Sequence, residues 1–425
     1  MDICIKNATL VSMADNRDKI EEEIDILISD DKILKIEKNI EVDENIKIID
    51  AKGKVVMPGL INTHAHVPMS IFRETLDGYN LQDWLNKKIW PMEDKLKEDD
   101  IYYASALSFI EMIKIGCTTI NDMYFMTEEI IKAMLDAGVR LQTTRCLMNM
   151  GDLELGDGRL SELGEIIDKY SNISNKLTFN VGIHGLYTSD EQYVEKCVEF
   201  AKRKNLPIHI HFCENSKEVE DIKETYNDEP VKILKKYFNE VHTILAHGVK
   251  ISKEDIEEIK DMDISIAHCP VSNLKLGCGI APIYEMQQAG INISIGTDGQ
   301  GSGSNLDLFE AMKYTALMQK GSLENPEIML AYDVLKMATV NGAKALGIED
   351  KIGTIEEGKQ ADLIIINMDN ILLKPQNDIL SEIVYNVKGR DVETTIVAGK
   401  ILMEEKKLKI NLDENEIIKK CEIII

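Results

Sequence analysis

The chain has 425 residues, 44% hydrophobic and 29% charged, a composition typical of a globular protein with one large core and room for a smaller domain. Its 49 basic and 74 acidic residues give a formal net charge of −25, which argues against nucleic acid and anionic membranes as partners, because both need concentrated positive charge. The eight cysteines form no Cys-x-x-Cys motif, and neither a secretory signal nor a membrane-spanning stretch stands out, so we expect a cytoplasmic protein with reduced thiols.

The first 56 residues contain short apolar and β-branched runs separated by turn-forming residues. This pattern predicts a small β unit with strands over Ile3–Lys6, Thr9–Val11, Asp25–Ser29, Lys32–Ile36 and Ile46–Asp50. Strand patterns return after residue 350, and residues 411–425 predict a short charged helix. Because neither end could form a convincing domain alone, we expect residues 1–56 and 351–425 to join as one composite β-sandwich domain.

Residues 57–350 have a different pattern, in which apolar strands alternate with amphipathic helices. Strands are predicted over Val55–Thr63, Cys117–Asn121, Val139–Cys146, Leu177–Ile183, Leu206–Phe212, Val241–Ala246, Asp263–Ala267 and Ile291–Gly296. Helices are predicted over Ile101–Ile115, Glu128–Ala137, Asp190–Lys204, Lys253–Lys260, Ile283–Ala289 and Asn305–Gln319. Eight β-then-α units indicate an α/β fold with a (β/α)8 TIM-type barrel, whose chemistry takes place at the C-terminal ends of the strands.

Two histidines at the end of the first barrel strand, His64 and His66, point to a metal site. Residues two apart on a strand face the same way, so both imidazoles would converge on one point. Of the eight histidines, seven fall at predicted strand ends, and these are His64, His66, His184, His209, His211, His247 and His268. Only His242 does not. Chance placement would scatter them over helices and loops, so this distribution favours metal ligands over ordinary histidines.

A site formed by His64, His66, His211 and Asp298 would offer nitrogen and oxygen ligands suited to zinc, with iron(II) as the alternative. We expect one divalent ion per subunit, which would lower the pKa of its bound water from about 15.7 to about 7. Glu214 lies three residues beyond His211 and is well placed to pass a proton from this water to a substrate. The alternative is that Glu214 is a solvated loop residue.

An ordered set of motifs covers nearly the whole chain, over Pro58–His66, His211–Glu214, Leu245–Gly248, His268–Gly277, Gly296–Gly299 and Gly358–Leu363. In these motifs the sequence resembles the amidohydrolase superfamily, and within it the branch of 5-methylthioadenosine/S-adenosylhomocysteine deaminases. The resemblance implies a mononuclear site, because binuclear relatives use a carboxylated lysine on strand four and residues 177–185 contain none.

The resemblance also implies roles for individual residues. His64, His66, His211 and Asp298 would bind the metal, and Asp298 would also take the proton of the attacking water. His247 would hold that water and the developing oxyanion, while Glu214 would protonate the purine N1. These roles imply hydrolytic deamination, in which hydroxide adds to C6 of adenine and ammonia leaves.

Fewer residues define the substrate class. Glu93 matches a family glutamate that accepts hydrogen bonds from both ribose hydroxyls, which favours a nucleoside. His184 matches a histidine near the purine, and Arg145 and Arg159 match arginines that can bind the carboxylate of S-adenosylhomocysteine, although both could instead form ordinary salt bridges.

We therefore expect S-adenosylhomocysteine, 5′-methylthioadenosine or adenosine as the substrate and a homo-oligomeric enzyme. The alternatives are a guanine or cytosine deaminase, a hydrolase of another aromatic leaving group, and a non-catalytic protein of the same fold. His209 and His268 are expected to support the site, and the role of Trp84 stays open.

Overall fold

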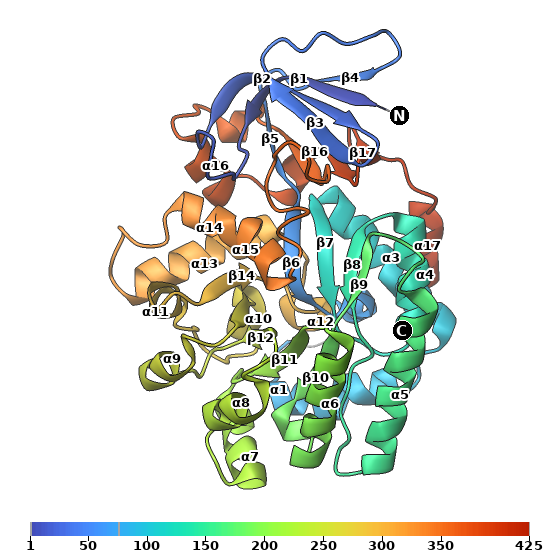
Figure 1. Ribbon diagram of the computed structural model, residues 1–425, viewed down its shortest axis with the longest axis vertical. Helices are drawn as coiled ribbons and strands as arrows, with labels where there is room; N and C mark the ends of the chain where they lie inside the picture. Colours follow the sequence, from blue (N-terminus) through green and yellow to red (C-terminus); the bar gives the residue numbers. More distant parts are fainter. Residues whose placement is uncertain (1, 75–76, 425) are drawn as a thin grey trace.

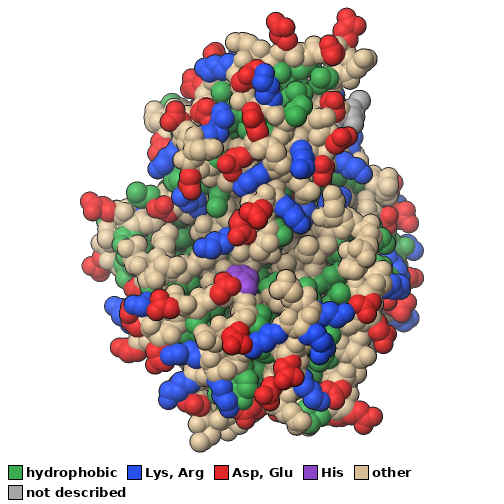
Figure 2. All heavy atoms as spheres, viewed as in Figure 1, with side chains coloured by type: hydrophobic (Ala, Val, Ile, Leu, Met, Phe, Trp, Pro, Cys, Tyr) green, Lys and Arg blue, Asp and Glu red, His purple; other side chains and the backbone are tan. Residues whose placement is uncertain are grey.

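The computed structural model describes residues 2–74 and 77–424. The molecule is elongated, and strands from both chain ends gather at one end of its long axis (Figure 1). Parallel strands with helices packed outside them form the rest. On the face drawn in Figure 2, acidic and basic side chains are interspersed over both parts. No helix in the described ranges is long and apolar enough to cross a membrane.

Two parallel sheets form the larger part of the molecule. The first contains β6 (Leu60–Ala65), β7 (Cys117–Asp122), β8 (Arg140–Thr143) and β9 (Leu177–Phe179). The second contains β10 (Val181–Gly185), β11 (Ile208–Phe212), β12 (Thr243–His247), β13 (Ile264–His268) and β14 (Asn292–Ile295). The β6–β9 and β10–β14 strands consist almost entirely of buried residues, as parallel strands covered by helices do. The result is a TIM-barrel-like α/β fold.

The helices vary widely in length. The longer ones are α3 (Glu98–Lys114), α4 (Thr127–Ala137), α5 (Leu153–Tyr170), α6 (Glu191–Lys204), α7 (Ser216–Tyr226), α8 (Pro230–Phe238), α13 (Leu308–Ser322) and α17 (Glu414–Cys421). The shorter ones are α9 (Lys253–Ile259), α10 (Pro270–Lys275), α11 (Ile283–Gln288), α12 (Gln300–Gly303), α14 (Ala331–Met337), α15 (Val340–Ala345) and α16 (Ile379–Tyr385). Brief 3-10 turns are η1 (Val67–Phe72), η3 (Leu186–Thr188), η4 (Ile371–Leu373) and η5 (Gly389–Asp391). One composite helix, formed by α1 (Leu81–Trp84), η2 (Leu85–Ile89) and α2 (Trp90–Glu93), lies over the strand ends.

Strands from the two ends of the chain pair in one nine-stranded sheet. It contains β1 (Ile3–Leu10), β2 (Glu21–Ser29), β3 (Lys32–Glu37), β4 (Lys47–Asp50), β5 (Lys54–Pro58), β15 (Leu363–Asn367), β16 (Val392–Val397), β17 (Lys400–Glu404) and β18 (Lys407–Leu408). β5 pairs antiparallel with β15, with Val56 opposite Ile365. Both side chains are buried in a hydrophobic cluster that also includes Ile5 and Ile396.

The predicted strand Val55–Thr63 is confirmed as extended backbone, but it is divided at Gly59 into two strands that belong to different sheets. The chain leaves the nine-stranded sheet at Pro58 and enters the first parallel sheet at Leu60. Gly59 lies between them, where a Cβ atom would stand 2.2 Å from the side chain of Thr118, so only glycine allows this approach. The strand expected over residues 177–183 is likewise interrupted, at Asn180.

Candidate metal centre and active site

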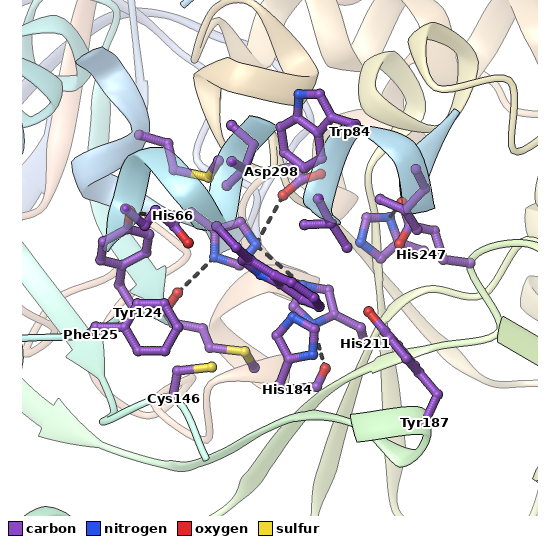
Figure 3. A pocket seen from close by; sticks show the side chains of 18 residues that line it. His66, Trp84, Tyr124, Phe125, Cys146, His184, Tyr187, His211, His247 and Asp298 are labelled. Carbon is purple, nitrogen blue, oxygen red and sulfur yellow. Dashed lines mark hydrogen bonds and ion pairs between the residues drawn. The ribbon is translucent and has the colours of Figure 1, made fainter. Parts of the chain in front are cut away.

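Four ligand-type groups converge at the C-terminal ends of the parallel strands. His66, His211 and Asp298 border the cavity drawn in Figure 3, and His64 lies next to His66 and Asp298. The Nε2 atoms of His66 and His211 lie 3.2 Å apart. Asp298 Oδ1 lies 3.2 Å from Nε2 of His66 and 3.5 Å from Nε2 of His64. His64 and His66 come from β6, His211 comes from β11, and Asp298 follows β14.

Each imidazole is held through its other ring nitrogen. Nδ1 of His66 donates to the carbonyl oxygen of Met123 at 2.7 Å, and Nδ1 of His211 donates to that of His184 at 2.5 Å. Nδ1 of His64 is hydrogen-bonded to Nε2 of His209 at 2.8 Å. These contacts fix the ring planes and leave the three Nε2 atoms facing one another, as the outer contacts of metal-binding histidines do.

The residues fit a divalent cation. Ligand atoms about 2.0–2.2 Å from a tetrahedral ion lie about 3.3–3.6 Å from each other, and the separations here are close to that range. His64 Nε2 is fully buried and has no hydrogen-bond partner among the described residues. Burial lowers the pKa of His64 to about 4 and that of His211 well below its ordinary value, so both rings are neutral at pH 7 and can act as ligands.

Asp298 is oriented by two hydroxyl groups. Oδ2 accepts hydrogen bonds from Ser272 at 2.6 Å and from Ser302 at 2.8 Å, which leaves Oδ1 toward the histidines. Burial opposes ionisation, but the neighbouring imidazoles of His64 and His66 outweigh it and hold the pKa of Asp298 well below its ordinary value. Asp298 has a φ of +62°, and such strained backbone concentrates at functional sites.

Glu214 lies in the loop that follows β11, and its carboxylate is buried. Its Oε1 lies 3.9 Å from Nδ1 of His247 and 3.8 Å from the thiol of Cys278. Burial, followed by the Asp298 charge, raises the pKa of Glu214 to about 8. A carboxyl group with this pKa is protonated at neutral pH and can donate a proton.

The loop that carries Glu214 is held in place by hydrogen bonds to a second buried carboxylate, that of Glu218. Glu218, in the first turn of α7, accepts the backbone N–H of Cys213 at 2.9 Å and that of Glu214 at 2.6 Å. His247 is held in a similar way, because its Nδ1 donates to Oδ1 of Asn273 at 2.8 Å. His247 Nε2 is buried without a partner in the described ranges, so it is available for a ligand.

A cavity opens beside these groups. His66, His211, Glu214, His247 and Asp298 line it. Its walls are mostly apolar and aromatic, and they include Met69, Leu81, Trp84, Leu85, Ile89, Trp90, Phe125, Cys146 and Tyr187.

Glu93 and His184 also line this cavity. Oε1 of Glu93 accepts a hydrogen bond from the Tyr124 hydroxyl at 2.5 Å, and burial raises the pKa of Glu93. The ring of His184 lies 6.4 Å from that of Trp90, measured between centroids, and its Nδ1 is hydrogen-bonded to Thr188 Oγ1 at 3.1 Å.

Arg145 and Arg159 are not among the lining residues. Arg145 lies behind the wall, where its Nε donates to Glu162 at 2.8 Å and its guanidinium lies over the Phe125 ring. Arg159 donates from Nη1 to the Met148 carbonyl at 2.6 Å, while its buried Nε has no partner within residues 2–74 and 77–424.

Several contributing residues had no sequence-based prediction. Tyr124 follows β7, so the rule used for the histidines, that polar residues after strands face the site, could have found it. Ser272 and Asn273 lie inside the motif His268–Gly277, but the sequence pattern predicts no role for either of them. Glu218 carries no local signal, since it resembles any helix glutamate.

The chain is similar to known proteins over nearly its whole length. Residues 55–402 match the family model of the amidohydrolase family. A 5-methylthioadenosine/S-adenosylhomocysteine deaminase from Caldanaerobacter subterraneus is 40% identical over 96% of this chain and 94% of its own. A 5′-deoxyadenosine deaminase from Methanocaldococcus jannaschii is 40% identical over 94% and 95% of the two chains. The structure of an adenosine deaminase from Xanthomonas campestris with bound zinc superposes with a TM-score of 0.94 at 26% identity, covering 100% of this chain and 97% of that one.

Proposed function

The chain belongs to the amidohydrolase family, and we propose that it is a metal-dependent aminohydrolase acting on adenine nucleosides. It replaces the C6 amino group of the adenine with oxygen and releases ammonia. The observation that carries this proposal is the convergence of three imidazoles and Asp298 Oδ1 beside a cavity that Glu93 and Glu214 also line.

We assign the metal to His64, His66, His211 and Asp298, and zinc is the ion that this nitrogen and oxygen set favours. When bound, the cation supplies a water that ionises near neutral pH. Asp298 accepts the proton of the attacking water. Its low pKa keeps it a carboxylate that is ready to do so.

The remaining groups act on the purine. Glu214 gives its proton to N1, which makes C6 more electrophilic. His247, held by Asn273, directs its free Nε2 toward the attacking water and the negative oxygen that develops from it. C6 becomes tetrahedral, and the amino group takes the proton held by Asp298 and leaves as ammonia. The C6 hydroxyl gives its remaining proton to the Glu214 carboxylate, so the product carries C6=O and N1–H and both acids return to their starting states.

The substrate assignment depends on Glu93. A carboxylate can accept one hydrogen bond on each oxygen from a vicinal diol, and the Tyr124 hydroxyl holds Glu93 in place. A free base such as guanine or cytosine has no diol for it. His184, which borders the same cavity, is assigned to the purine.

Arg145 and Arg159 remain a prediction as ligands of the S-adenosylhomocysteine carboxylate. Two guanidinium groups beside one carboxylate, Glu162, leave an uncompensated positive charge, and the unpartnered Nε of Arg159 favours an added anion. We expect Arg159→Lys to raise the KM for S-adenosylhomocysteine and to leave the KM for 5′-methylthioadenosine unchanged.

One panel tests the function. The purified protein is assayed for ammonia release from S-adenosylhomocysteine, 5′-methylthioadenosine, 5′-deoxyadenosine, adenosine, guanine and cytosine, with Glu93→Ala as the matched variant. We expect activity on the adenosine compounds only, with a raised KM and unchanged metal content in Glu93→Ala. Activity confined to the free bases would contradict the proposal.

We further propose that the two parallel sheets close into one (β/α)8 barrel spanning residues 57–350. The paired strands of residues 1–56 and 351–425 would then form one composite domain beside it. A cytoplasmic homo-oligomer with one metal ion per subunit completes this assignment.

A further inference from the structure

The composite helix over the cavity contains one turn that is wider than the rest. The Leu85 N–H donates to the carbonyl of Leu81, four residues earlier, as in an α-helix. The Trp90 N–H instead donates to the carbonyl of Leu85, five residues earlier, which is the hydrogen bond of a π turn. The spacing of four returns with Asp94, which donates to Trp90. The helix therefore accommodates one extra residue between Leu85 and Trp90.

The spacing of the side chains that line the cavity shows what this extra residue does. Six residues of the helix line it, namely Leu81, Trp84, Leu85, Ile89, Trp90 and Glu93. Leu81, Trp84 and Leu85 follow the i, i+3, i+4 pattern of one helix face. The same face would continue at i+7, i+8 and i+11, but the other three residues stand one position later, at i+8, i+9 and i+12. Removing one residue between Leu85 and Ile89 would therefore bring all six residues onto one face of a regular helix. In a regular helix an extra residue turns everything after it by about 100°. The π turn absorbs that rotation.

Pro91 supplies a reason for the π turn. A proline inside an α-helix has no N–H to donate, and its ring clashes with the carbonyl four residues earlier, here that of Lys87. It also disfavours α geometry at the preceding residue, Trp90. A wider turn before Pro91 removes the clash, and π turns occur mostly as single turns of this kind at functional sites.

We propose that Pro91 and the extra residue before it act as a pair that sets the specificity of the site for ribose. Pro91 is a positioning residue: it stabilises the π turn, and the π turn directs Glu93 and Trp90 into the cavity. This inference rests on the proposed function, since it takes Glu93 to be the ribose ligand.

The proposal predicts how single and double changes combine. Pro91→Ala lets the helix adopt α geometry while the extra residue remains, so Glu93 turns about 100° away from the cavity. Deletion of Lys87 removes the extra residue but leaves Pro91 inside a regular helix, where it clashes. Lys87 is exposed, and among the described residues its one ion pair is with the partly exposed Asp83, so its own loss costs little. The double variant has neither the extra residue nor the proline clash. Its regular α-helix therefore directs the cavity-lining side chains, Glu93 included, back into the cavity.

The experiment compares wild type, Pro91→Ala, the Lys87 deletion and the double variant, with Pro230→Ala as control. Pro230 is the first residue of α8, where a proline does not disturb the helix, and it is not among the cavity residues. For each protein kcat/KM is measured on adenosine and on 2′-deoxyadenosine, which lacks one of the two hydroxyls. Metal content is measured alongside.

A second readout does not depend on activity. Trp84 and Trp90 are the only two tryptophans of the chain, and both lie on this helix, so intrinsic fluorescence reports its register. We expect red-shifted emission in both single variants as Trp90 leaves the cavity, and emission like that of wild type in the double variant and in Pro230→Ala.

In the kinetics we expect each single change to lower kcat/KM for adenosine roughly ten- to a hundredfold, the range for losing a hydrogen bond to a charged group. The preference for adenosine over 2′-deoxyadenosine should fall with it, and the double variant should recover both. A Pro91→Ala enzyme with unaltered preference and emission, or a double variant no better than the single ones, would overturn the proposal. If wild type deaminates no nucleoside, the proposed function fails, while the fluorescence of the four proteins still decides whether Pro91 sets the helix register.

Discussion

Glu218 offers a direct test of whether the catalytic loop must be held from behind. Glu218 is 1% exposed, and its carboxylate accepts the N–H groups of Cys213 and Glu214 at 2.9 and 2.6 Å. Hydrogen bonds to a charged group contribute about 1.5–3 kcal/mol each, so losing both in Glu218→Ala would cost up to about 6 kcal/mol. Burial, followed by the Glu214 charge, raises the pKa of Glu218 to about 7, so desolvation offsets part of this gain. We therefore expect about 3 kcal/mol.

The assay separates stability from catalysis. Urea unfolding gives the free energy of unfolding of Glu218→Ala, and steady-state kinetics give kcat and KM on folded, metal-loaded enzyme. Because Glu218 acts through Glu214, kcat should fall about a hundredfold, near the lower limit for general acid catalysis, while KM changes little. Glu218→Gln keeps one acceptor oxygen and should recover part of both losses. Glu220→Gln, an exposed change on the same helix, is the control. An unchanged kcat in folded Glu218→Ala would refute this reasoning.

Three further predictions concern the same cavity. Because the pKa of Glu214 is raised to about 8 and its protonated form is the active one, kcat/KM should fall as the pH rises through about 8, and Glu214→Gln should lose most of the activity together with this decline. A chelator should abolish deamination and lower the midpoint of thermal unfolding. Zinc at a hundred times its Kd should restore about 2.7 kcal/mol of stability. A thermal midpoint that does not change when zinc is added would contradict the ligand assignment. Tyr124→Phe should raise the KM for adenosine about three- to tenfold with kcat unchanged, because Glu93 loses the one side chain among the described residues that donates a hydrogen bond to it. Equal effects on the KM for 2′-deoxyadenosine and for adenosine would count against the ribose role of Glu93.

The proximity of the four proposed ligands could be predicted from sequence because the pattern that indicates it is local. His64 and His66 lie two apart on one strand, His211 lies at the end of another, and Asp298 follows a third, so the fold brings them together whatever the loops do. The alternation of strands and helices predicted the α/β fold for the same reason. Gly59 was harder to interpret, because the need for glycine there comes from Thr118, a residue far along the chain.

The other side of the cavity could not be predicted in this way. The helix from Leu81 to Glu93 was not expected, because the extra residue breaks its 3.6-residue periodicity and Pro91 reads as a helix breaker. The hydrogen bonds of Glu218, Ser272 and Asn273 depend on tertiary contacts that no spacing encodes. Helix α5, which carries Arg159, was also missed, since Gly156, Gly158 and Gly164 make its sequence a poor helix pattern.

The division of the chain at Gly59 into β5 and β6 also affects the order in which parts of the protein can fold during synthesis. β5 is joined through this one residue to β6, which carries His64, and the antiparallel neighbour of β5 is β15, about 300 residues later in the chain. At translation rates of 5–20 residues per second, roughly 15 to 60 seconds separate the emergence of the two strands from the ribosome. The first histidines are therefore made early, but the strand that anchors them gains its β15 partner only when the polypeptide is nearly finished.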